Sequence, residues 1–114
     1  MPYLQIQTNI DINTEQQADL LKSASKIVAT ALNKSENYIM IALQPKTPML
    51  FAGTEQPTAF LILKSLRLPV ENTQELSQTL CSFIKEKLNI QTDRIYIEFI
   101  NPEPSLWGWN ERTF

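Results

Sequence analysis

The sequence predicts an α/β fold of the α+β kind, in which a β-α-β unit occurs twice within one domain. Two helical patterns end in the same Leu-Asn pair, at 32–33 and at 88–89, which lie 56 positions apart. Apolar segments with the pattern of strands flank each helical pattern. We therefore expect two halves, about 2–57 and 58–114, in a single domain spanning 1–114. Each half pairs two parallel strands through a helical crossover.

The first half contains two expected strands, 3–10 and 38–44, separated by an expected helix. Apolar and polar residues alternate in 3–10, which is typical of a half-buried strand. Thr14 and Gln17 have the spacing of a capping box, and helical periodicity then extends to about Asn33. The residues that recur at helical spacing are Ala18, Leu21, Ala24, Val28, Ala31 and Leu32.

The second half repeats this order. The strongly apolar segment 58–66 predicts a strand, and 94–100 predicts the last one. Between them, Asn72 and Glu75 offer another capping pair for a helix that extends to about Leu88. The positions at helical spacing in this segment are Leu76, Leu80, Phe83, Ile84, Lys87 and Leu88. Together the two halves predict a four-stranded mixed sheet with two helices on one face.

The chain offers nothing to cover the second face of this sheet. The segments 38–44, 58–66 and 94–100 carry apolar residues on both faces, which is typical of strands buried on both sides. The two helices can cover one face only. We therefore expect self-association into a closed symmetric oligomer.

Composition excludes several kinds of site. The 114 residues include 10 basic and 12 acidic side chains, a net charge of −2, so no basic surface for nucleic acid is indicated. The chain has no histidine, which removes Ser-His and Cys-His nucleophile pairs and the common zinc ligand sets. We expect no metal and no cofactor. The single cysteine, Cys81, lies near the apolar helical positions and is interpreted as a buried small hydrophobic residue and not as a nucleophile.

Pro2, directly after Met1, has two interpretations. Proline lacks a backbone N–H and is tolerated as the first residue of a strand, so it can simply begin the strand 3–10. Alternatively, removal of Met1 would leave Pro2 with a free secondary amine, a base that no other residue offers. An ordinary terminal amine titrates at about 7.7–8.0, and burial or a nearby lysine lowers its pKa.

Five further segments occur in an order that, with the duplicated layout, favours the second interpretation. These segments are Asn33-Lys34, Lys64-Ser65-Leu66, Asp93-Arg94-Ile95-Tyr96-Ile97, Gly108-Trp109-Asn110 and Thr113-Phe114. Over essentially the whole chain they resemble the macrophage migration inhibitory factor and D-dopachrome tautomerase family. The resemblance implies a homotrimer built around a central barrel of sheets, with pockets at the subunit interfaces. It also implies keto–enol tautomerisation of small aromatic 2-keto acids such as phenylpyruvate.

The resemblance assigns roles to individual residues. Pro2 is implied to be the acid–base catalyst and Lys34 to bind the substrate carboxylate, although a lysine at a helix C-terminus also stabilises the helix dipole. The other implied pocket residues are Ser65, Leu66, Tyr96, Glu98, Trp107, Trp109 and Phe114. Tyr96 and Glu98 are expected from the neighbouring subunit. Glu98 departs from the asparagine of the best-known members, and Trp107 replaces a smaller aliphatic residue.

Two other functions remain open at this point. Animal members of the family act as cytokines, and binding to an unknown protein receptor would leave Pro2 dispensable. Distant relatives use the same proline for decarboxylation or hydration with arginines in the pocket, and we expect none of Arg67, Arg94 and Arg112 at a matching position. No signal-peptide pattern precedes the first strand and no apolar stretch could span a bilayer. We expect a cytoplasmic protein that can be released without a signal peptide.

Overall fold

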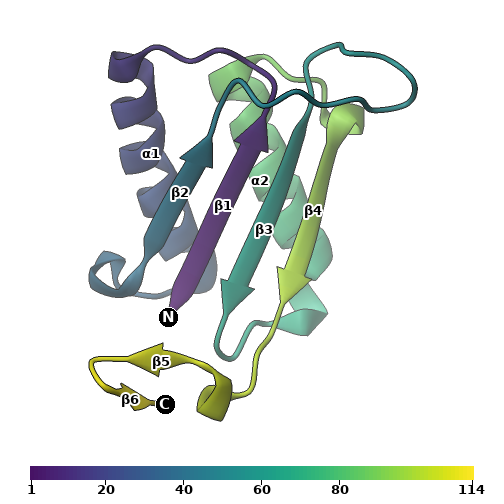
Figure 1. Cartoon of the computed structure of the whole chain (residues 1–114). Helices are drawn as coiled ribbons and strands as arrows, with labels where there is room; N and C mark the ends of the chain where they lie inside the picture. Colours follow the sequence, from purple (N-terminus) through teal and green to yellow (C-terminus); the bar gives the residue numbers. More distant parts are fainter.

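Four strands form one sheet, and two helices pack against one of its faces (Figure 1). The computed structural model describes all 114 residues. The strands of the sheet are β1 (Pro2–Thr8), β2 (Met40–Gln44), β3 (Ala59–Ser65) and β4 (Ile95–Ile100). The helices are α1 (Thr14–Leu32) and α2 (Thr73–Leu88). The predicted fold class is confirmed.

The sheet has the order β2-β1-β3-β4. β1 and β2 are parallel and are connected through α1, and β3 and β4 are parallel and are connected through α2. β1 and β3 pair antiparallel, with Pro2 opposite Ser65 and Thr8 opposite Ala59. The two β-α-β units therefore meet along their first strands. This pairing places the start of β1 beside the end of β3.

The start of α1 differs from the expected capping box by one residue. The N-cap is Asn13, whose side-chain oxygen accepts a hydrogen bond from the backbone N–H of Gln16 at 2.8 Å. Thr14 is the first residue inside the helix. The Gln17 side chain reaches back as expected, but it donates to the carbonyl of Ile12 at 2.7 Å. Asparagine and threonine are both good N-caps, and the local hydrogen bonds select Asn13.

The second expected cap is confirmed in position only, since Asn72 is the N-cap residue of α2 without acting as a hydrogen-bonding cap. The Asn72 side chain makes no capping hydrogen bond, because Val70–Asn72 forms a 3₁₀ turn that leads directly into α2. A similar turn, Glu36–Tyr38, shortens the expected strand 38–44, which begins at Met40. Short 3₁₀ segments are common as connectors, and the periodicity of the sequence does not reveal them.

One stripe of each helix faces the sheet. The buried residues of α1 are Leu20, Ala24, Val28 and Leu32, and those of α2 are Leu76, Leu80, Phe83 and Ile84. The expected α1 stripe was therefore partly wrong, since Ala18 and Ala31 are exposed. Alanine fits either face of a helix, so its spacing carries little information. Lys87 also lies outside the core and pairs with Asp19 at 3.6 Å. Cys81 is half-buried against the core.

The other face of the sheet is left open by this chain. Its side chains alternate with the buried ones in the observed register, and they include Tyr3, Gln5, Met40, Phe60, Ile62, Lys64, Tyr96 and Glu98. Met40 and Tyr96 are 65% and 61% exposed. The expectation that the chain cannot cover both faces is confirmed. Neither helix has the length and apolar character needed to cross a membrane.

The two ends of the chain lie at the same end of the sheet. A small hairpin of β5 (Gly108–Trp109) and β6 (Arg112–Thr113) lies beside the start of β1 (Figure 1). Its turn, 110–111, has positive φ at both residues, which is the geometry that favours a tight two-residue hairpin. The backbone N–H of Phe114 donates to the carbonyl of Trp107 at 3.2 Å. This bond closes the C-terminal tail on itself, and residues 107–109 of the tail line one cavity together with Pro2.

Candidate active site

Pro2 is fully buried at the start of β1, opposite Ser65 of β3. Lys34 reaches this place from the end of α1. The helix ends at Asn33, which adopts a left-handed conformation with φ 53° and ψ 50°. Asparagine tolerates this conformation better than most residues, and the turn sends Lys34 back toward the sheet.

The Lys34 ammonium is anchored to the end of β3. Its Nζ donates to the Ser65 hydroxyl at 2.8 Å and to the Leu66 carbonyl. Ser65 is fully buried and donates in turn to the Leu66 carbonyl at 3.1 Å. Lys34 is therefore not a solvated lysine that only neutralises a helix end. Its ammonium group is held beside Ser65, which pairs with Pro2 across the sheet.

The electrostatic environment favours neutral amines at this place. Burial lowers the pKa of the Met1 terminal amine from its ordinary value of 8.0, and the Lys34 charge lowers it further. Burial also lowers the pKa of Lys34, with a further contribution from the Arg67 charge. Both effects act against the protonated form of an amine.

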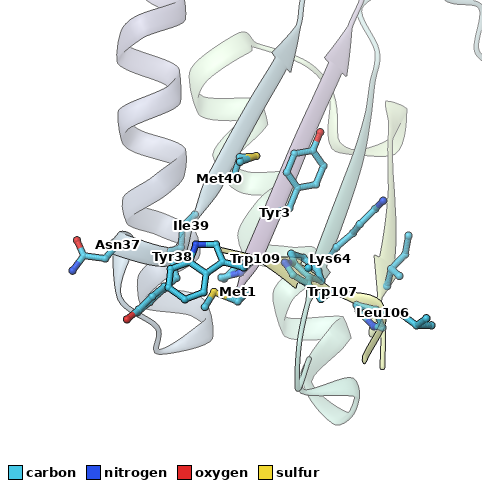
Figure 2. A pocket seen from close by; sticks show the side chains of 14 residues that line it. Met1, Tyr3, Asn37, Tyr38, Ile39, Met40, Lys64, Leu106, Trp107 and Trp109 are labelled. Carbon is cyan, nitrogen blue, oxygen red and sulfur yellow. The ribbon is translucent and has the colours of Figure 1, made fainter. Parts of the chain in front are cut away.

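An apolar cavity of about 610 Å³ opens at the start of β1 (Figure 2). Nine of its 14 lining residues are hydrophobic. The larger side chains that line it are Met1, Tyr3, Tyr38, Met40, Lys64, Leu106, Trp107 and Trp109. Tyr38 contacts Trp109 edge to face, with ring centroids 6.4 Å apart. Such aromatic walls suit a flat apolar group.

A second cavity of about 500 Å³ lies on the other side of Met1 and is cationic. Its lining residues are Met1, Lys34, Leu66, Arg67, Pro104 and Phe114. Phe114 stacks on Trp109 of the first cavity, with centroids 5.9 Å apart. Met1 lines both cavities, and no acidic residue lines either one. The start of β1 is therefore the junction between an aromatic cavity and a cationic one.

The chain was compared with known proteins. The family model described as macrophage migration inhibitory factor matches residues 1–114. A macrophage migration inhibitory factor homolog of Brugia malayi is 39% identical over 116 residues, covering 100% of this chain and 99% of that protein. The crystal structure of the homologue from Prochlorococcus marinus superposes with a TM-score of 0.91, at 38% identity and 98% coverage of both chains. The corresponding protein of Trichinella spiralis superposes with a TM-score of 0.90 at 29% identity, covering 98% of this chain and 99% of that one.

The chain belongs to the macrophage migration inhibitory factor family. The resemblance seen in the sequence is thereby confirmed over the whole chain. The family includes tautomerases and cytokine-like proteins. No three histidine, cysteine, aspartate or glutamate side chains lie close enough together to hold a metal ion.

Most of the predicted site residues lie together in this member of the family. Those that line the two cavities or anchor Lys34 are Pro2, Lys34, Ser65, Leu66, Trp107, Trp109 and Phe114. Tyr96 and Glu98 line neither cavity in the single chain. Tyr96 lies opposite Phe60, five residues along β3 from Ser65, which is about 16 Å at the usual rise of a strand. Its ring contacts Phe51, with centroids 4.8 Å apart.

Several cavity residues escaped the sequence analysis. Arg67, which was not among the predicted site residues, lines the cationic cavity together with Lys34. Tyr38 and Met40 line the aromatic cavity because β2 pairs with β1, with Met40 opposite Tyr3. The pairing of these two strands was expected, but its register and the 3₁₀ turn Glu36–Tyr38 before β2 were not. Lys64, noted as a strand-end cation, lines the same cavity, with its Nζ 5.9 Å from the Tyr3 ring centroid.

Proposed function

We propose that the protein is a tautomerase that interconverts the keto and enol forms of small aromatic 2-keto acids such as phenylpyruvate. The observation that carries the proposal is the position of Pro2, which is buried, lines the aromatic cavity and directly follows Met1, the residue that lines both cavities. The proposal requires removal of Met1, which makes the Pro2 nitrogen a secondary amine. Removal of Met1 also removes the side chain that lines both cavities.

The reaction needs a neutral base and a cation. The neutral Pro2 amine takes a proton from the carbon next to the keto group. The electron pair of that C–H bond forms the C=C bond, and the C=O π electrons move to oxygen, which then takes up a proton to give the enol. Burial and the Lys34 charge, which lower the pKa of the terminal amine in this structure, favour the neutral form. Proline is also rigid, so little entropy is lost in orienting the amine.

The two cavities match the two parts of such a substrate. An aryl group fits between Tyr38, Trp107 and Trp109, where offset or edge-to-face ring contacts are available. The keto acid group then points toward Lys34. No acidic side chain lines either cavity to repel it.

We also propose that the site is completed in a homotrimer. The open sheet face, which carries exposed Tyr96 and Met40, supports burial against other copies of the chain. Tyr96 and Glu98 cannot reach Pro2 within one chain, so they would enter the pocket from a neighbouring subunit. A carboxylate at Glu98 near an anionic substrate would reduce the affinity for the acid, which favours modest activity.

The test is phenylpyruvate ketonisation by protein whose N-terminus has been checked by mass, compared with Pro2→Gly. Glycine at position 2 also allows removal of Met1, but it replaces the rigid secondary amine. We expect at least a tenfold loss of kcat/KM, the lower range for acid–base catalysis. Pro48→Gly, in an exposed loop, is the matched control. Equal activity of Pro2→Gly and the parent would contradict the proposal and favour the protein-binding role of the family's cytokine-like members.

A further inference from the structure

Arg67 is the one arginine of this chain that the fold does not use. Arg94 donates to the backbone carbonyls of the loop before β3, at 2.9–3.4 Å, and so fixes that loop. Arg112 lies over the Trp109 ring, 5.3 Å from its centroid. Arg67 makes no hydrogen bond and no ion pair. Its guanidinium is exposed, and its residue lines the cationic cavity with Lys34.

The backbone at Arg67 is also unusual. Its φ of 54° lies in the left-handed region, which is unfavourable for a residue with a Cβ. Glycine would adopt this conformation without that cost. Strained residues of this kind are concentrated at functional sites. Six other non-glycine residues also have positive φ, including Lys46, which lines neither cavity. What distinguishes Arg67 is therefore its unpaired guanidinium on the wall of a cavity.

The donors of Lys34 are largely occupied, unlike those of Arg67. Two of the three ammonium protons go to Ser65 and to the Leu66 carbonyl, so one direction remains for a ligand. Arg67 retains its five N–H donors in a planar fork that fits a carboxylate with two parallel hydrogen bonds. The two cations repel each other, and no acidic side chain of the cavity compensates them. An anion bound between them would.

We propose that Arg67 binds the carboxylate of the substrate and that Lys34 holds the oxygen that becomes the enolate. This inference rests on the tautomerase function proposed above. It assigns the two negatively charged groups of the reacting substrate, the carboxylate and the enolate oxygen, to two different cations. The ligand class is a small organic acid with its carboxylate on the Arg67 side and its apolar group toward Trp109. Lys64, in the aromatic cavity, is the competing cation.

The experiment compares an acid with its neutral counterpart. Turnover of phenylpyruvate and of its methyl ester is measured for the parent and for Arg67→Gly, Arg67→Lys and Lys64→Gln. Arg67→Gly is expected to lower the acid-to-ester ratio of kcat/KM at least tenfold, the loss of one hydrogen bond to a charged group. Arg67→Lys retains the positive charge but not the planar guanidinium. Its acid-to-ester ratio is expected to lie between those of the parent and of Arg67→Gly. Lys64→Gln tests the competing cation: a tenfold fall of the ratio in this variant, with no fall in Arg67→Gly, would place the carboxylate at Lys64 and overturn the role of Arg67.

Lys46→Gly is the matched control. Lys46 is an exposed cation with the same φ of 54°, at the far end of the sheet after β2. The variant removes one positive charge and the same backbone strain without touching either cavity. Its acid-to-ester ratio is expected to equal that of the parent.

A binding measurement separates this inference from the proposed function. 3-Phenylpropionate has the carboxylate and the ring but no keto group, and its binding is followed by the fluorescence of Trp107 and Trp109. We expect at least a tenfold weaker affinity in Arg67→Gly. An unchanged affinity and an unchanged acid-to-ester ratio overturn the role of Arg67, even if turnover still depends on Pro2. Turnover that survives Pro2→Gly overturns the proposed function, whereas the binding result still decides whether Arg67 holds a carboxylate.

Discussion

Replacing Ser65 with alanine removes one of the two protein acceptors of the Lys34 ammonium. The hydroxyl is buried between β1 and the Lys34 side chain, and it accepts from Nζ at 2.8 Å. Alanine fits the same space, so the change deletes a hydrogen bond without adding bulk. Lys34 keeps its bond to the Leu66 carbonyl and loses its fixed direction toward Pro2.

The expected effect follows from the exposure of the charged group. A hydrogen bond to a charged group contributes about 1.5–3 kcal/mol. Lys34 is only partly buried, so water replaces part of the lost hydrogen bond. We therefore expect a loss of about 1 kcal/mol in transition-state stabilisation. This energy corresponds to a loss of about fivefold in kcat/KM for phenylpyruvate. We place Ser65 as a positioning residue that acts through Lys34.

A double-mutant cycle measures that dependence. Ser65→Ala is made in the parent and in Lys34→Met, and kcat/KM is measured for all four proteins. In the Lys34→Met background, Ser65→Ala should have no further effect, because the ammonium that Ser65 orients is absent. Ser25→Ala, on α1 away from both cavities, controls for loss of a hydroxyl. An equal loss from Ser65→Ala in both backgrounds would refute the reasoning.

Two further predictions concern pH and assembly. In this structure burial and the Lys34 charge lower the pKa of the Met1 amine from 8.0, and after removal of Met1 we expect the same surroundings to lower the pKa of the Pro2 amine, so kcat/KM should fall as the pH drops through that lowered pKa. Lys34→Met removes the neighbouring charge, so in a pH–rate profile the fall of kcat/KM at low pH should move to higher pH. An unchanged profile would show that Lys34 does not influence the pKa of the base. Sedimentation should give the mass of three chains for the parent and of single chains for Ile62→Asp, which places a charge on the open sheet face. A parent that sediments as single chains at micromolar concentration would contradict the proposed trimer.

The fold followed from the sequence because its signals are local and repeated. Alternation in the first strand and the two Leu-Asn helix ends were read from short segments, and Asn33 and Asn89 do adopt the left-handed conformation at those ends. The helix starts were less well predicted. Asn13 and Thr14 are both acceptable N-caps, and Asn72 lies in a 3₁₀ turn that leaves no periodic trace.

The candidate site was predicted where it depends on strand ends and not where it depends on packing between distant segments. The position of Lys34 beside Ser65 agrees with the family resemblance, and the hydrogen bond between them gives it a physical basis. Arg67 was missed because nothing in the sequence marks its left-handed backbone or its lack of a partner. Tyr38 was missed because the sequence predicts that β1 and β2 pair but gives neither their register nor the 3₁₀ turn that contains Tyr38.

The most direct test of the central claim is phenylpyruvate ketonisation by protein that mass spectrometry shows to begin at Pro2, beside Pro2→Gly prepared in the same way. The account predicts turnover by the parent and at least a tenfold loss in the variant, because the Pro2 amine at the aromatic cavity is the base. Equal turnover by both proteins, or none by either, would mean that Pro2 only begins a strand.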